Sequence, residues 1–257
     1  MESQNLDGLD GWAKQYNYGH HCAFLGLINS VNHSEGTVDL SEFMTVVSNE
    51  DGTYTVTLDK FNDYIVSKNV NLVASVTLTK SEIENNGQVF GDLDTKILDT
   101  AIVKLCQINY DTSYEYAWRE AYNKVGQNKL ISMLFYGTEK YHSVNVLNEK
   151  EDFLIYWDLY KTHKISAMPV SFWTLSGNHD YKSGLIQGHE YSIKDVNVEK
   201  EYVEFINPMD DKDVLRLPFD YLFESDSLRS FNLFFYGQSK TAINKLVSDY
   251  KAEHGIT

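Results

Sequence analysis

The sequence predicts an α+β protein with a helical N-terminal lobe, residues 1–145, and an antiparallel β-rich C-terminal lobe, residues 146–257. Apolar residues at helical spacing dominate the first part of the chain. From residue 165 onward short apolar runs are separated by turns, which is the pattern of an antiparallel sheet. The chain has 257 residues, of which 42% are hydrophobic and 14% aromatic. This is enough to build the core of one large domain or of two lobes.

The N-terminal half carries the clearest helical patterns. Residues 22–31 are apolar around most of the helical circumference, as expected of a buried helix. Residues 94–107 place apolar side chains at helical spacing behind Asp94, a suitable N-cap. Further helices are expected at 114–126 and 152–161, and strands at 53–58 and 70–78.

The C-terminal half contains a series of short strand-like segments. Each of them is a short apolar run, and turns lie between them. The expected strands are 167–175, 188–196, 202–206, 214–217 and 231–236, and a closing helix is expected at 240–252.

Two of these strands are expected to form a hairpin with a chemical consequence. A charged stretch between them, residues 194–201, indicates a turn. If that turn centres on Val198, His189 and Asn207 lie opposite each other. Directly paired side chains on one sheet face lie about 4.5–5.5 Å apart at Cβ. The sequence therefore predicts a histidine beside an amide that could orient its ring.

Charge and cysteine content exclude several classes of partner. The formal net charge is −15, so nucleic acid and anionic membrane surfaces are not expected partners. No apolar run is long enough to span a membrane, and residues 1–10 do not have the composition of a signal peptide. We expect a soluble protein, cytoplasmic or delivered as an excised domain, with a location that the sequence leaves unknown. The chain has two cysteines, Cys22 and Cys106, which are too few for a disulfide framework. They could form a single disulfide bond or remain as two free thiols.

Cys22 is the candidate nucleophile. A glycine-containing loop, Gly19-His20-His21, brings it to the first turn of an apolar helix. Backbone N–H groups and the helix dipole at such a position favour a thiolate. Gln15 lies just upstream, where its amide could donate to a developing oxyanion. Cys106 lies within an apolar helical segment and is expected to be a core residue.

At these residues the chain resembles the calpain-like branch of the papain superfamily of cysteine proteases. The segment Gly188-His189-Glu190-Tyr191-Ser192-Ile193 is similar to the family's Gly-His-Ala-Tyr-Ser-Val box. Asn207-Pro208-Met209 matches part of its Asn-Pro-Trp-Gly box, with Met209 in place of the Trp. The segment from Gln15 to Ala23 is more loosely similar to its Gln-Gly-x-x-Gly-Asp-Cys-Trp box.

The resemblance implies a papain-like two-lobe fold and a thiol protease, a hydrolase with a catalytic triad that acts on protein or peptide substrates. Cys22 would be the nucleophile, His189 the general base, Asn207 the residue that orients it and Gln15 the oxyanion donor. No cofactor is implied. The acidic pattern that binds calcium in calpain cores is not recognisable, and the aspartates at 210, 211 and 213 are expected to form a solvated turn.

Three alternatives stay open at this point. The same triad could carry out transglutamination or deamidation of a glutamine side chain. The chain could also be an inactive protease fold that serves as a binding or structural module. A zinc site is a weaker alternative, with candidate ligands at His20, His21, Cys22 and His33.

Overall fold

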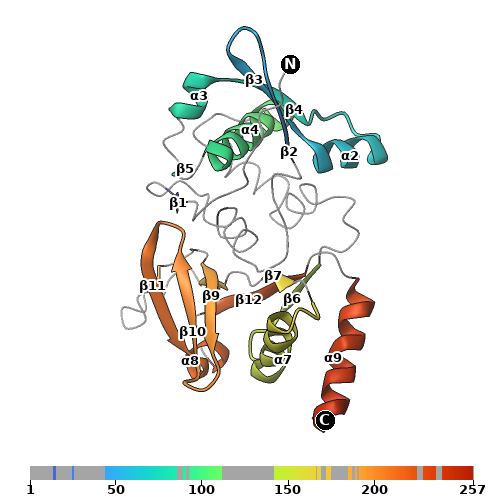
Figure 1. Ribbon diagram of the computed structural model, residues 1–257, viewed down its shortest axis with the longest axis vertical. Helices are drawn as coiled ribbons and strands as arrows, with labels where there is room; N and C mark the ends of the chain where they lie inside the picture. The colour runs from blue at the N-terminus through green and yellow to red at the C-terminus, as the bar shows by residue number, and fades with distance from the viewer. Residues whose placement is uncertain are drawn as a thin grey trace. The chain divides into compact units, whose positions relative to one another are not determined.

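The computed structural model has mixed helices and antiparallel sheets, which confirms the predicted α+β class (Figure 1). It describes residues 14–15, 25, 44–85, 89–90, 93–111, 142–165, 167–168, 172–174, 185–186, 189, 191–224, 228–235 and 239–256. Contacts divide the chain into two compact units. The first takes in Met1–His21 and Asp39–Gly137, and the second takes in Cys22–Val38 and Thr138–Thr257.

The described part of the first unit includes a three-stranded antiparallel sheet, a separate two-stranded sheet and the long helix α4. The three-stranded sheet has the order β2-β3-β4, and a tight turn at Gly52, with φ of 81°, joins its first two strands. Gly52 suits this turn because it adopts a positive φ without strain. The elements of this unit are β1 (Lys14–Gln15), β2 (Met44–Ser48), β3 (Thr53–Leu58), α2 (Asp59–Lys68), β4 (Ser75–Thr79), α3 (Lys80–Glu84), β5 (Val89–Phe90) and α4 (Leu93–Tyr110).

Several predicted elements of this unit are confirmed. The predicted strand 53–58 is β3, and the predicted helix 94–107 is the central part of α4. The expected strand 70–78 was wrong at its start, because β4 begins at Ser75. The predicted helix 114–126 lies outside the described residues. Of the predicted helix 22–31 the structure describes Leu25 alone, which is helical and fully buried.

The second unit contains two antiparallel sheets around an aromatic core. One sheet has the order β11-β10-β9, and the other has the order β6-β12-β7, with β8 also paired to β12 (Figure 1). Its elements are β6 (His142–Asn145), α7 (Lys150–Lys161), β7 (Ala167–Met168), β8 (Phe172–Thr174), β9 (Ser192–Asn197), β10 (Tyr202–Asn207), β11 (Asp210–Pro218), α8 (Phe219–Glu224), β12 (Leu228–Phe235) and α9 (Lys240–His254).

Aromatic side chains hold the helices of this unit against its sheets. The rings of Phe153 from α7 and Phe231 from β12 have centroids 5.0 Å apart, and Phe223 from α8 lies 5.7 Å from Phe231. Such tilted pairs add about 0.5–1.5 kcal/mol to the burial of their apolar area. The predicted helices 152–161 and 240–252 are confirmed as α7 and α9.

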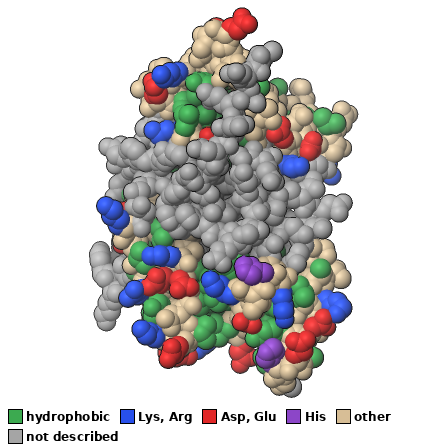
Figure 2. Space-filling model, in the orientation of Figure 1, with side chains coloured by type: hydrophobic (Ala, Val, Ile, Leu, Met, Phe, Trp, Pro, Cys, Tyr) green, Lys and Arg blue, Asp and Glu red, His purple; other side chains and the backbone are tan. Residues whose placement is uncertain are grey.

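Charged side chains of both signs are interspersed over the visible face of the second unit (Figure 2). Two ion pairs link elements that are far apart in the sequence. Lys251 Nζ of α9 lies 2.7 Å from Asp152 Oδ1 of α7, and Lys150 Nζ lies 2.9 Å from Glu201 Oε1. No helix in the described part of the chain is both long and apolar enough to cross a bilayer.

The hairpin of β9 and β10 has a different register from the predicted one. Compared with the pairing that a turn centred on Val198 would give, the partner of Tyr202 is three positions along, at Asn197, and the partner of Ile206 is two positions along, at Ser192. The turn therefore lies closer to the end of the charged stretch. The prediction missed a β-bulge: Glu204 pairs with Asp195, whereas Phe205 pairs with Ile193, so that Lys194 is an extra residue in β9.

Candidate functional site

His189 and Asn207 are in direct contact, although they are not opposite each other in the hairpin. His189 Nε2 lies 2.8 Å from Asn207 Oδ1. The two residues are 5% and 4% exposed. The predicted juxtaposition of a histidine and an amide is therefore confirmed, while the register from which it was predicted was wrong.

The bulge at Lys194 explains how the two side chains meet. Opposed residues of an antiparallel pair share a face, and a shift of one residue moves a side chain to the other face. Continued past Ile206 and Ser192, the observed register sets Asn207 opposite Tyr191. Without the extra residue Asn207 would be opposite Ser192 instead. Since alternate residues of an extended segment share a face, the bulge brings Asn207 onto the face of Tyr191 and His189.

Tyr191 supports the histidine from the same face. Its ring meets the His189 ring edge-on, with centroids 5.1 Å apart. Tyr191 is 1% exposed, and its hydroxyl accepts a hydrogen bond of 2.8 Å from the Ile186 backbone N–H. Through this hydrogen bond the tyrosine, which directly precedes β9, holds the segment at Ile186 that comes before His189.

The orientation of the Asn207 amide is fixed by two further contacts. Its Oδ1 accepts a hydrogen bond of 2.9 Å from the Met209 backbone N–H. Its Nδ2 donates to Asp213 Oδ2 over 3.0 Å. A backbone N–H can only donate and an ionised carboxylate can only accept. Oδ1 therefore faces His189.

This orientation determines the tautomer of the histidine. Because Oδ1 has no proton to donate, Nε2 of the neutral ring must carry the proton and donate it to Asn207. The lone pair of the neutral ring is then on Nδ1. A histidine held in this tautomer is a base at Nδ1, with an orientation set by the amide.

Burial lowers the pKa of His189 below its ordinary value of 6.5, because the charged ring is poorly solvated there. The hydrogen bond to Asn207 opposes this effect and raises the pKa, by a smaller amount. The environment described around the ring therefore favours neutral imidazole near pH 7, in which Nδ1 can accept a proton.

Of the other predicted site residues, the structure describes only the backbone of Gln15 and does not describe Cys22. Gln15 pairs through its backbone with Val89 of β5, and its side chain is outside the described set. Cys22 lies outside the described residues, as do the candidate zinc ligands His20, His21 and His33. Their approach to His189 stays a prediction.

Cys106 is a core residue, as predicted. It is a free thiol, 3% exposed, on the buried face of α4. Burial is the main cause that raises its pKa to about 12, and the Asp99 carboxylate contributes a smaller rise. A thiol with such a pKa is almost entirely protonated near pH 7 and is a poor nucleophile.

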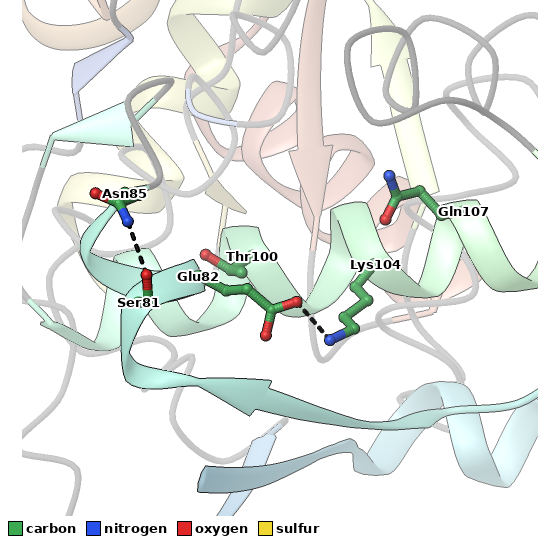
Figure 3. Close-up of a pocket in the computed structure, with 6 residues that line it drawn as sticks. All are labelled: Ser81, Glu82, Asn85, Thr100, Lys104 and Gln107. Carbon is green, nitrogen blue, oxygen red and sulfur yellow. Dashed lines mark hydrogen bonds and ion pairs between the residues drawn. The ribbon is translucent and has the colours of Figure 1, made fainter. Parts of the chain in front are cut away.

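The first unit contains a pocket of about 310 Å³ between α3 and α4, lined by residues with polar side chains (Figure 3). Its lining residues are Ser81, Glu82, Asn85, Thr100, Lys104 and Gln107. Lys104 Nζ lies 2.6 Å from Glu82 Oε1, so the two charges of the pocket are paired with each other. Glu82 also completes the capping box of α3 with Thr79. These contacts explain the pocket's charged residues as parts of the fold.

Within the described residues no group of three or more His, Cys, Asp or Glu side chains could hold a metal ion. Two aspartates that follow Asn207 have local partners. Asp210 Oδ1 accepts from the Lys212 backbone N–H over 3.1 Å, and Asp213 accepts from Asn207. Asp210 and Asp213 are both exposed, as predicted, but they lie in strand β11 and not in a turn, and Asp213 also contacts Asn207. A signal was present in the sequence, because a carboxylate six residues after Asn207 can return beside it in a tight hairpin.

The chain matches no model of a known protein family, and a search of curated proteins finds no significant match.

Proposed function

We propose that the chain is a cysteine protease with a papain-like two-lobe fold, similar to calpain cores, that hydrolyses peptide bonds. Cys22 is the nucleophile, His189 the general base and acid, Asn207 the residue that orients the imidazole, and Gln15 a donor to the oxyanion. The substrate is a protein or peptide. Thiolate, imidazole and water supply every group that this reaction needs, so the proposal includes no cofactor.

One observation carries the proposal: the buried hydrogen bond of 2.8 Å from His189 Nε2 to Asn207 Oδ1. The bond determines which ring nitrogen is basic, and a general base needs a fixed basic nitrogen. Here the Met209 N–H and the Asp213 carboxylate both hold the amide in the orientation that leaves the basic lone pair on Nδ1. An orienting group of this kind is the third member of a nucleophile–base–orienter triad.

The proposed reaction begins with transfer of the Cys22 thiol proton to His189 Nδ1. The thiolate attacks the carbonyl carbon, and a C–S bond forms while the carbonyl oxygen takes on negative charge that Gln15 stabilises. The C–N bond then breaks, and the Nδ1 proton passes to the leaving amine. A water molecule next attacks the thioester and gives a proton to Nδ1, and the C–S bond breaks to release the acid.

Covalent labelling tests the nucleophile. An epoxide that alkylates protease thiolates is expected to modify Cys22 in the wild-type protein and to leave Cys22→Ala unmodified. Cys106→Ala is the matched control and should label as the wild type does, because the Cys106 thiol is buried and protonated. Peptide mapping by mass spectrometry identifies the modified residue. Absence of labelling at Cys22 in the folded protein would contradict the proposal.

Product analysis tests the reaction. Incubation with a protein substrate and a primary amine, followed by mass spectrometry, separates three products of the same triad chemistry. Cleaved peptides support the proposal. A mass gain of about one dalton on glutamine, or an amine adduct, would instead identify a deamidase or a transglutaminase. A folded protein that gives none of these products and does not label would be an inactive module.

A further inference from the structure

Asp213 is linked to the His189–Asn207 pair by its hydrogen bond with Asn207. It lies in β11, the strand on the other side of β10 from the histidine segment. Phe205 pairs with Leu215 and Ile206 with Val214. Continued by one residue, this register sets Asn207 beside Asp213 on the face that carries Phe205. A local irregularity then shifts the Asn207 backbone pairing to Asp210, while the side-chain contact to Asp213 is kept at 3.0 Å.

We propose that Asp213 is a positioning residue of the catalytic site, which selects the reactive tautomer of His189 by holding the Asn207 amide in one of its two orientations. The inference deepens the proposed function and rests on it, because a chosen tautomer matters for catalysis only if His189 acts on a nucleophile. The three segments that resemble calpain-like motifs do not include Asp213, so the resemblance assigns it no role.

The cost of the opposite orientation explains why the carboxylate is effective. If the Asn207 amide turned over, its Nδ2 would face the Met209 N–H, donor against donor. Its Oδ1 would face Asp213 Oδ2, acceptor against a negatively charged acceptor. Hydrogen bonds to an ionised group are roughly twice as strong as neutral ones. The carboxylate is therefore the larger of the two restraints.

Loss of this restraint would change which nitrogen of the His189 ring carries the proton. In the turned-over amide, Nδ2 would donate to His189 Nε2, which must then be the acceptor, and the ring proton would move to Nδ1. A neutral ring with its proton on Nδ1 cannot accept the Cys22 proton at that atom. Asp213→Ala should thus lower the fraction of His189 that is competent as a base, without altering any group that touches substrate.

The first test measures the tautomer directly and does not depend on activity. In ¹⁵N-labelled Cys22→Ala protein, the nitrogen shifts of His189 should show the proton on Nε2. Adding Asp213→Ala should raise the fraction with the proton on Nδ1. Asp195→Ala is the matched control, since it also removes an exposed strand aspartate, from β9, and should leave the tautomer unchanged. Identical His189 spectra with and without the Asp213 carboxylate would overturn the inference.

The second test measures kinetics. Asp213→Ala should lower kcat for peptide cleavage by roughly tenfold to a hundredfold, by analogy with the loss of residues that orient the ligands of a catalytic metal. KM should not change, because Asp213 is two hydrogen bonds from the reacting atoms. Asp213→Asn should retain more activity than Asp213→Ala, because the oxygen of the new amide can still accept from Asn207. Equal kcat in Asp213→Ala and wild type would overturn the inference while the protease proposal stands.

An exchange of the two groups provides a third readout. Asn207→Asp alone sets two carboxylates against each other, with oxygens about 3 Å apart. The double variant Asn207→Asp, Asp213→Asn restores a donor–acceptor pair and keeps an acceptor for His189. It should be about tenfold more active than Asn207→Asp alone. A double variant no more active than Asn207→Asp would contradict the positioning role.

The two proposals can fail independently. If the wild type cleaves no peptide but Asp213→Ala still shifts the tautomer of His189, the protease proposal fails and the control of the ring by Asp213 holds.

Discussion

His189 Nε2 lies 2.8 Å from Asn207 Oδ1, but the two residues come from positions that are not opposed in their hairpin. The contact depends on one extra residue, Lys194, which shifts the phase of β9 relative to β10. A single inserted residue thus decides which face of the sheet carries the histidine. The geometry of the candidate site is in this sense a property of the strand pairing as well as of the two side chains.

Deletion of Lys194 tests this dependence. Without the bulge, the segment before it should shift by one residue, which moves Tyr191 and His189 to the face opposite Asn207. Peptide cleavage should fall by at least about a hundredfold, the usual contribution of general acid–base catalysis. Lys194→Ala is the control, because its side chain is exposed and its removal keeps the backbone count. A folded deletion variant with wild-type activity would contradict the role of the bulge.

Titration of His189 tests the environment of the ring. In Cys22→Ala protein, where no thiolate can raise it, the pKa of His189 should lie below 6.5, because burial disfavours the charged form. Asn207→Leu should lower this pKa further, since the hydrogen bond to Asn207 raises it. The ring-proton shifts in NMR spectra report both values. A pKa at or above 6.5 in the Cys22→Ala protein would be inconsistent with the buried neutral ring.

The same shift predicts the pH dependence of stability. Between the folded pKa of His189 and its unfolded value, the unfolded chain binds a proton that the folded chain does not, so stability rises with pH across this window. As the pH falls below about 6.5, the free energy of unfolding should therefore decrease more steeply in Cys22→Ala than in Cys22→Ala with His189→Gln. Urea unfolding at several pH values measures the difference. Parallel curves for the two proteins would show that His189 is not buried in its neutral form.

Tyr191 should contribute to stability through its hydroxyl and to the site through its ring. Tyr191→Phe removes the acceptor of the Ile186 N–H and should lower the free energy of unfolding by about 1 kcal/mol. Activity should be largely kept, because the aromatic edge against His189 remains. Tyr191→Leu loses the ring as well and should lower kcat further. Equal kcat for the two variants would show that the ring does not support the histidine.

The two cysteines should differ in reactivity. Iodoacetamide at pH 8 is expected to alkylate Cys22 in the folded protein and Cys106 only after unfolding, because the pKa of the buried Cys106 thiol is raised to about 12. Mass spectrometry of peptides before and after addition of denaturant checks this order. Rapid alkylation of Cys106 in the folded protein would contradict its place in the core of the first unit.

The parts of the fold that the sequence predicted are those with a strong local pattern. The helix at 94–107 is correct because most of its residues are buried and repeat at helical spacing. In contrast, α2 was not predicted, since Phe61 is its only buried residue and its pattern is weak. The contact of His189 with Asn207 was predicted correctly from a register that was wrong, because at the Asn207 end of the hairpin the error is two positions and an even shift leaves each side chain on its face.

The sequence contained an indication of the bulge, namely a break in the alternation of apolar and polar residues in β9. Ile193 and Val196 are both buried but are three residues apart, with two exposed residues between them. The role of Asp213 was not predicted. Its spacing of six residues allows a hairpin return to Asn207, but only the course of β11 shows that the return occurs. Local charge indicated only a solvated turn there.

The proposal that His189 and Asn207 serve a thiol nucleophile is tested most directly by one distance in a crystal structure, that between Cys22 Sγ and His189 Nδ1. We expect a separation within about 4 Å, close enough for proton transfer between a nucleophile and its base. A separation above about 7 Å, in a crystal form where the loop that carries Cys22 is free of lattice contacts, would contradict the protease proposal.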